Sequence, residues 1–278
     1  MGNLITCNDV GKYLGVSIAD ATVNAKITAL IAQASAAIEK VCDRTFAETE
    51  YREWYDGTGT AYLKLNQYPI TRLYQVSCSA QDLARLSYAG TSPEAFASCD
   101  GVTLTLVDYE AHDLTLATYA TATTLKAVVE LVTGWTLTID SGMDSYDTRK
   151  IQPFSAYVLG AGDEYDLQIP DEAIESRVSA NTKWLIEGRF SASPLSVFVW
   201  YKAGYATIPA DLQYVATRIV SDAYRMSKRD TTFKSEKLGD YGYTAADPSS
   251  GSDSQFSMSD LLAPYASMLR QFKRVEMA

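Results

Sequence analysis

Histidine is nearly absent from this sequence, and cysteine is rare. Of the 278 residues one is a histidine, His112, and four are cysteines, Cys7, Cys42, Cys78 and Cys99. No two cysteines form a C-x-x-C pair, which disfavours a zinc site, and reduced, mostly buried thiols are expected instead. A Ser–His–Asp or Cys–His arrangement would have to use His112, yet no G-x-S-x-G motif accompanies it. We therefore expect His112 to be a solvated loop residue.

Other signatures of enzymes and membrane proteins are missing as well. The sequence contains no dinucleotide fingerprint and no Walker loop, and among its 34 acidic residues no spacing singles out a catalytic pair. The N-terminus lacks the basic and apolar regions of a signal peptide, and no run of about twenty apolar residues is present to span a bilayer. These absences predict a non-enzymatic protein without metal, cofactor or membrane contact, made in the cytosol.

Basic residues are also fewer than acidic residues. Lys and Arg number 24 against 34 Asp and Glu, for a net charge of −10. Proteins that coat nucleic acid neutralise phosphates with cations, so this balance argues against such a function. An acidic surface suits a conduit through which DNA slides, but most acidic proteins are simply soluble, and that explanation is favoured. The 47% of hydrophobic residues suffices for one large or two modest domains.

The first residues predict two helices. Thr6 and Asp9 form a capping box for a short helix over 8–14, which Gly15 ends. A longer helix is expected over 22–42, because apolar residues recur there at three- and four-residue spacing. Its other face is rich in alanine and serine, which permits close packing against another helix or a neighbouring subunit. The apolar face comprises Ile27, Leu30, Ile31, Ala34, Ile38 and Val41.

Strand-like segments follow the long helix. Residues 51–55 and 61–65 flank the glycine-rich segment 56–60, and 73–77 is a further strand candidate. A phosphate-binding loop requires a helix N-terminus directly after its glycines. Because a strand-like segment follows here, we interpret 56–60 as the turn of a β-hairpin.

The character of the sequence changes between Ser79 and Ser193. The segment 123–131 has helical spacing, whereas the other periodic segments alternate as strands do. We therefore predict an inserted α+β domain over 79–193. Its tyrosines and threonine-rich strands are either ordinary sheet residues, which we favour, or a surface for another protein or a glycan. The predicted strands are 102–107, 113–117, 134–139 and 154–159.

A strand, a helix and a loop are predicted in succession between Leu195 and Thr244. The β-branched and aromatic run 197–201 is typical of a buried strand. Gly204 ends it, and Pro209 opens a helix over 208–229 in the first turn, where a proline is tolerated. The polar, glycine-punctuated segment 235–243 is expected to be a loop. The apolar face of the helix comprises Leu212, Val215, Ala216, Ile219, Ala223 and Met226.

This succession, with AGY-x-x-IPADL at the helix start and SEKLGDYGYT in the loop, resembles the head–tail connector proteins of tailed bacteriophages. These are also called adaptor or head completion proteins. The YDGTGT, L-x-L and PI segments after the long helix match the same family. The resemblance implies an α+β fold in which residues 1–78 and 194–244 form a helical connector core with β-hairpin strands, interrupted by the inserted domain.

The resemblance also implies a structural function rather than an enzymatic one. Such proteins are made in the host cytoplasm and assemble as a ring, commonly twelve-fold, beneath the portal protein at the head–tail interface of the virion. The ring extends the DNA channel, so DNA is only in transient passage, and it presents a platform for a downstream tail or nozzle protein. The alternative is a β-rich binding module of a virion or cell-surface protein, carbohydrate-binding through the tyrosine-rich insertion.

Two segments are the candidate contact sites. Residues 245–256 are small and polar and predict a flexible linker; the segment 257–278 after it predicts an amphipathic helix with Pro264 in or near its first turn. This helix is predicted to dock onto the portal, and its alternative is to fold back onto its own core. The docking residues are Leu261, Leu262, Tyr265, Met268, Leu269, Phe272, Arg270, Lys273 and Arg274. The predicted subunit-contact loop comprises Lys237, Leu238, Gly239, Asp240 and Tyr241.

Overall fold

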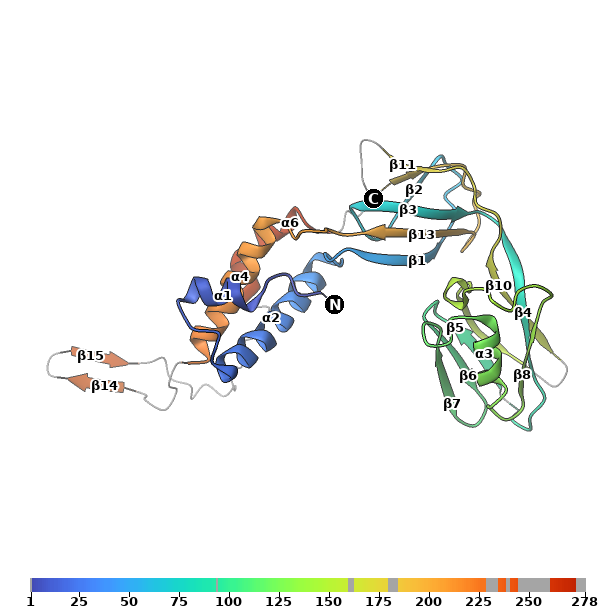
Figure 1. The fold of residues 1–278 in the computed structure, drawn as a ribbon, viewed down its shortest axis with the longest axis horizontal. Coiled ribbons are helices and arrows are strands. Elements are labelled where there is room, and N and C mark those ends of the chain that lie inside the picture. Colours follow the sequence, from blue (N-terminus) through green and yellow to red (C-terminus); the bar gives the residue numbers. More distant parts are fainter. Residues whose placement is uncertain are drawn as a thin grey trace. The chain divides into compact units, whose positions relative to one another are not determined.

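The chain is an α+β protein that divides into two compact units (Figure 1). Residues 1–48 and 204–278 form one, here called the helical unit, and residues 49–203 form the other, the β unit. Every ladder between named strands is antiparallel, and the predicted α+β class is confirmed. The computed structural model describes residues 2–93, 95–159, 163–179, 185–228, 235–238, 241–244 and 261–273.

The helices predicted over 8–14, 22–42 and 208–229 are present in the helical unit, whereas the described part of the helix predicted over 257–278 contains only a short 3-10 turn and a five-residue α-helix. Thr6 and Asp9 form the expected capping box of the first one, and Gly15 ends that helix in the left-handed conformation that glycine adopts at low cost. Pro209 is the N-cap residue of the α4 helix. The elements are α1 (Cys7–Leu14), α2 (Ala21–Cys42), α4 (Ala210–Met226), the 3-10 turn η2 (Ala263–Tyr265) and α6 (Ala266–Arg270).

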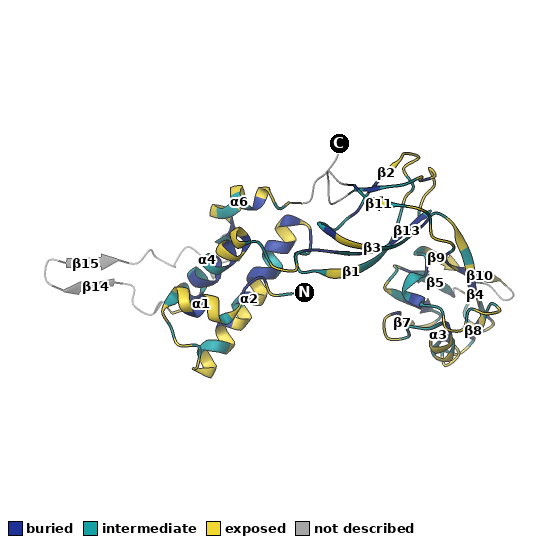
Figure 2. Cartoon of the chain, turned by 45° about the horizontal axis from the view of Figure 1, so that its top comes forward, coloured by how far each residue is buried: buried dark blue, intermediate teal, exposed yellow. Residues whose placement is uncertain are grey.

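The apolar stripes of these helices meet in one core. Ile27, Ile31 and Ile38 of α2 are buried against residues of α4 such as Val215 and Ile219. Burying each such side chain stabilises the fold by about 1.5–3 kcal/mol. Figure 2 shows the opposite side of α2 as largely exposed, and the alanines on it include Ala25, Ala29 and Ala32. The sequence periodicity therefore predicted which face of each helix is buried, except at Val41, which is exposed.

The segment predicted as a polar loop contains two short strands instead. β14 (Ser235–Leu238) and β15 (Tyr241–Thr244) pair in register, with Leu238 opposite Tyr241. A Gly-Asp pair between two short segments that contain Tyr, Thr and Leu is compatible with a hairpin sequence, so the loop interpretation was wrong for these eight residues.

The β unit contains a three-stranded sheet built from distant parts of the chain. β1 (Thr49–Tyr55), β13 (Val197–Ala203) and β3 (Ile70–Ser77) lie in the order β1-β13-β3. A smaller sheet has the order β11-β12-β2 and consists of β11 (Arg177–Val178), β12 (Leu185–Glu187) and β2 (Tyr62–Lys64). The two sheets share a core that includes Leu63, Leu65, Val76, Ile186, Phe190, Val199 and Tyr201.

The predicted hairpin across residues 56–60 does not form. β1 pairs with β13, and β2 pairs with β12. The loop between them packs instead on residues 191–196, where the Gly57 N–H donates to the Ser193 carbonyl at 2.7 Å and Asp56 Oδ1 accepts from the Leu195 N–H at 2.7 Å. A Cβ atom on Gly57 would lie 1.7 Å from the Ser191 carbonyl oxygen. Glycine is thus required for this close approach rather than for a turn.

The rest of the β unit is a lobe of two sheets, one helix and one 3-10 turn around a separate core (Leu83 to Ile169). The predicted strands are present, and sequence reasoning missed β4, β5 and β10. One sheet has the order β10-β4-β8: β10 (Glu164–Pro170), β4 (Ala80–Tyr88), β8 (Trp135–Ile139). The other has the order β7-β6-β5-β9: β7 (Ala111–Thr115), β6 (Thr103–Val107), β5 (Phe96–Cys99), β9 (Phe154–Val158). The helical pieces are α3 (Ala122–Val129) and η1 (Thr148–Lys150).

The boundary between the compact units differs from the predicted domain boundary. The units divide at 48/49 and 203/204, whereas the sequence predicted 78/79 and 193/194. The reason is β13, which pairs with both β1 and β3 and so keeps all three strands in one sheet. That 79–193 folds as a separate domain stays a prediction.

Candidate functional site

The C-terminal segment packs on the core of its own helical unit. Leu262 and Leu269 are buried there, and Leu261, Tyr265, Met268 and Phe272 lie half-buried against it. Pro264 lies in the first turn of η2, as expected. Of the predicted cations, Arg270 and Lys273 are exposed, and Arg274 lies outside the described residues.

Two side-chain contacts join this segment to the rest of the helical unit. The Phe272 ring meets the Phe46 ring edge to face, with 6.2 Å between centroids, and Arg218 of α4 donates from Nε to the Tyr265 hydroxyl at 3.4 Å. This is the fold-back arrangement that the sequence left open as the alternative. The same apolar stripe cannot simultaneously fill a groove on a partner, so portal docking stays a prediction that requires release of the segment or use of its exposed side.

The predicted subunit-contact loop is described in part. Lys237, Leu238 and Tyr241 lie in the β14–β15 ladder, where Lys237 is opposite Gly242 and Leu238 is opposite Tyr241. Gly239 and Asp240 lie outside the described residues. A role of this segment in contacts between subunits stays a prediction.

Sequence reasoning missed a surface on which cations and aromatic rings gather, here called the cationic face. It is one side of the β1-β13-β3 sheet, where the register sets Glu50 opposite Lys202 and Arg52 opposite Trp200, and Lys202 opposite Arg72. The Arg52 guanidinium lies 4.6 Å from the centre of the Trp200 ring. These residues come from three separated strands, so no run in the sequence marks them.

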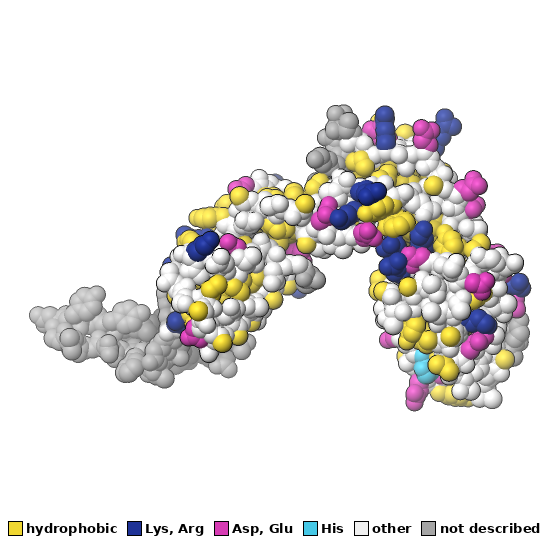
Figure 3. All heavy atoms as spheres, viewed as in Figure 1, with side chains coloured by type: hydrophobic (Ala, Val, Ile, Leu, Met, Phe, Trp, Pro, Cys, Tyr) yellow, Lys and Arg dark blue, Asp and Glu magenta, His cyan; other side chains and the backbone are white. Residues whose placement is uncertain are grey.

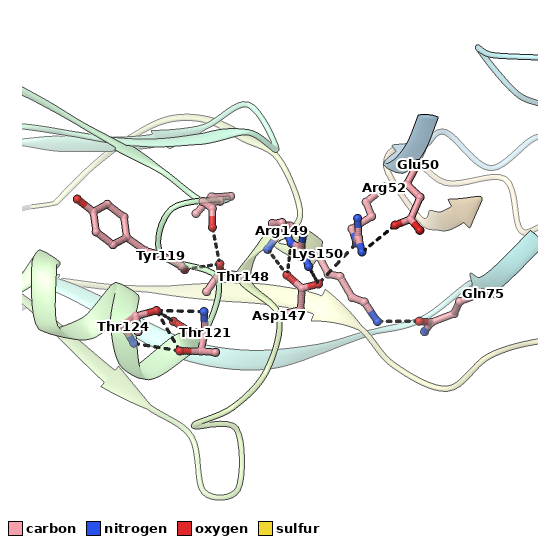
Figure 4. Close-up of polar contacts among 11 residues, drawn as sticks. Glu50, Arg52, Gln75, Tyr119, Thr121, Thr124, Asp147, Thr148, Arg149 and Lys150 are labelled. Carbon is pink, nitrogen blue, oxygen red and sulfur yellow. Dashed lines mark hydrogen bonds and ion pairs between the residues drawn. The ribbon is translucent and has the colours of Figure 1, made fainter. Parts of the chain in front are cut away.

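The 3-10 turn η1 adds further charge to the cationic face (Figure 4). Lys150 Nζ donates to Gln75 Oε1 at 2.9 Å and lies 4.9 Å from the centre of the Trp200 ring. Asp147 accepts two bonds from the Arg149 guanidinium, both at 2.8 Å, and lies 3.5 Å from Arg52 Nε. Arg52, Arg149 and Lys150 are therefore each held by a ring or a carboxylate.

The electrostatics of η1 follow from these contacts. Burial tends to raise the pKa of Asp147, but hydrogen bonds from Arg149 and the charge of Arg52 outweigh it and hold that pKa below its usual range. The hydrogen bond to Asp147 raises the pKa of Arg149. Burial lowers the pKa of Lys150. The ionised Asp147 is thus the carboxylate that holds the cations of η1 in place.

Replacing Asp147 by asparagine is expected to destabilise the β unit by about 1–2 kcal/mol at neutral pH, since hydrogen bonds to charged groups are lost. A depressed carboxyl pKa contributes stability above the unfolded pKa of about 3.9, and this contribution disappears as pH falls through the lower folded value. The difference in unfolding free energy between wild type and Asp147→Asn, measured in urea, should therefore shrink below about pH 4. Asp144→Asn, an exposed carboxylate in the same loop, is the control. A difference that stays constant with pH would contradict the ion-pair explanation.

On the opposite side of the same sheet a half-buried carboxylate contacts two tyrosines. Glu53 accepts hydrogen bonds from the hydroxyls of Tyr55 and Tyr201, the latter at 2.7 Å. The backbone N–H groups of Asn66 and Gln67 donate to the same two hydroxyls, at 3.1 and 3.3 Å. Burial raises the pKa of both tyrosines, which keeps them protonated. The network fixes the chain after β2 to the sheet, which is a structural role.

The residues that the sequence offered for nucleophilic catalysis are His112 and the cysteines. His112 is in β7 rather than in the expected loop, and its Nε2 lies 3.6 Å from Asp108 Oδ1. Burial raises the pKa of Cys42 and of Cys99 to about 11. Within the described ranges no three His, Cys, Asp or Glu side chains are grouped to hold a metal ion. No described helix is both long enough and apolar enough to cross a membrane.

Comparison with known proteins gave one family. The family described as head completion protein matches residues 3–136, which confirms the resemblance predicted from the sequence. The match runs past Ser79, so part of the predicted insertion belongs to the matched region. No curated protein matches the chain. A solved structure titled "Neck of empty GTA particle computed with C6 symmetry" is similar with a TM-score of 0.35 and 12% identity, covering 99% of this chain and 92% of that one.

Proposed function

We infer that this chain, whose residues 3–136 match the head completion protein family, forms a ring beneath the portal of a tailed phage. The family match is the observation that carries this proposal, and it points to a structural protein of the head–tail junction. The ring, which we propose is twelve-fold, extends the DNA channel and joins the capsid to a downstream tail or nozzle protein.

The structure supplies elements suited to such a ring. The α2 helix has 22 residues and buries one side against α4, while small side chains on the exposed side, such as Ala25, Ala29 and Ala32, permit close approach of a neighbour. A net charge of −10 is compatible with a channel through which DNA passes without binding. The function then depends on burial and symmetry rather than on a reaction.

Electron microscopy of the purified protein, alone and with a candidate portal protein, tests the proposal. We expect closed rings, either free or seated on the portal, and the class averages give their rotational order. A portal mixed with an unrelated acidic protein is the control for nonspecific association. A chain that stays monomeric and leaves the portal bare in both preparations would contradict the proposed function.

A further inference from the structure

A second charged surface, here called the acidic face, lies on the β10-β4-β8 sheet. In β10, alternation turns Leu167 into the lobe and leaves Glu164 and Asp166 pointing outward. In β4, a register shift opposite Leu167 turns Leu83 into the lobe together with Ala84 and Leu86, while Asp82 and Arg85 stay exposed in an outward row. Register sets Asp166 opposite Arg85 in this outward row. Arg85 lies 3.5 Å from Glu164 and 3.9 Å from Asp140. The acidic face thus comprises four carboxylates, Asp82, Asp140, Glu164 and Asp166, and one cation, Arg85.

The cationic face has the opposite balance. Its cations are Arg52, Arg72, Arg149, Lys150 and Lys202, and its carboxylates are Glu50 and Asp147. Figure 3 shows Lys and Arg side chains gathering at the lower edge of this sheet. Both faces are sides of antiparallel sheets within the β unit. The net charge is about three positive on one and about three negative on the other when all groups are ionised.

We propose that the cationic face of one copy contacts the acidic face of the next copy in the ring. The inference rests on the proposed function and adds the surfaces through which neighbouring subunits recognise one another. Oppositely charged patches steer association and fix its register, whereas like charges brought together are repelled. Two cationic faces therefore repel, and the contact must be head to tail. Head-to-tail contacts generate a ring when the rotation closes.

An acidic protein surface fits the cationic face better than DNA does. The Trp200 ring is stacked on Tyr74, with 4.8 Å between centroids, and the cations of Arg52 and Lys150 lie over it. A ring occupied in this way does not offer a platform to a nucleic-acid base. The chain itself carries a net charge of −10, so a second copy supplies the required negative charge.

Charge reversal tests the contact. The variant Arg72→Glu/Lys202→Glu reverses the cationic face, and Asp82→Lys/Asp166→Lys reverses the acidic face. Each variant alone is expected to lose ring formation, with self-association weakened at least about ten-fold in sedimentation at low salt. An equimolar mixture is expected to recover self-association to within about three-fold of wild type, because reversed and intact faces then alternate around the ring.

Two further variants keep the test decisive. Arg177→Glu/Arg189→Glu changes the net charge by the same amount at exposed positions in and beside the β11-β12-β2 sheet, and it should leave self-association within about two-fold. Arg72→Gln/Lys202→Gln avoids placing three glutamates in a row with Glu50, and it should weaken association in the same direction if the reversal variant does not fold.

The outcomes separate the inference from the proposed function. Rings that form equally well with both reversed variants would overturn the face-to-face contact and leave the proposed ring standing. The contact is also overturned if the mixture shows no recovery, or if Arg72→Glu/Lys202→Glu loses only binding to duplex DNA. A wild-type chain that neither self-associates nor binds a portal would remove the proposed function and the inference with it.

Discussion

Truncation after Gly251 is expected to lower the melting temperature of the helical unit by about 10–20 °C. The truncation removes Leu262 and Leu269, which are buried in the core of that unit, together with four half-buried side chains that cover it. Losing a buried leucine typically costs about 2–5 kcal/mol, and the loss of two gives a melting shift of this order. Thermal unfolding followed by circular dichroism measures the shift.

A single substitution provides the matched experiment in the full chain. Leu269→Ala should destabilise the helical unit by about 3–5 kcal/mol, whereas Ser267→Ala, at an exposed position two residues earlier, should change stability by less than about 0.5 kcal/mol. Equal effects of the two would contradict burial of Leu269. Portal binding by the truncated chain is a separate readout, because undiminished affinity would remove the predicted docking role and leave the fold-back packing unaffected.

Helix periodicity predicted the helical unit well, because a 3.6-residue repeat is local information. Thr6 and Asp9 marked the start of α1, and the apolar positions of α2 and α4 predicted their buried faces. Strand partners are not local. The β-forming residues of β1 indicate a strand, but nothing in them identifies β13, nearly 150 residues later, as the pairing strand.

The candidate sites show the same limit. The spacing of Leu262, Leu269 and their neighbours predicted one apolar stripe, yet a stripe is equally suited to its own core and to a partner, and the structure places it on its own core. The cationic face combines Arg52, Arg72 and Lys150, which no sequence window contains together. A surface of this kind becomes visible only once the strand register is known.

The largest effect is expected from deleting the β unit. The two ends of the helical unit that flank residues 49–203 lie close together. The Tyr205 N–H donates to the Phe46 carbonyl at 2.8 Å, and Ala47 forms a parallel bridge with Tyr205. Joining Glu48 to Gly204 through two glycines therefore requires no rearrangement. We expect a soluble protein with helical circular dichroism and one cooperative transition, because the helical core loses none of its buried residues.

Deleting only residues 82–190, close to the boundaries that the sequence alone predicted, is expected to fail. That deletion cuts β4 after its second residue and removes Ile186 and Phe190 from the core shared by the two small sheets. β2 also loses its partner strand β12. Exposing this apolar surface and an unpaired edge should drive the protein into aggregates. Soluble yield and light scattering of the two deletions, expressed in parallel, compare the boundaries. A soluble 82–190 deletion beside an insoluble 49–203 deletion would show that the β1-β13-β3 sheet belongs with the helices, as the sequence first predicted.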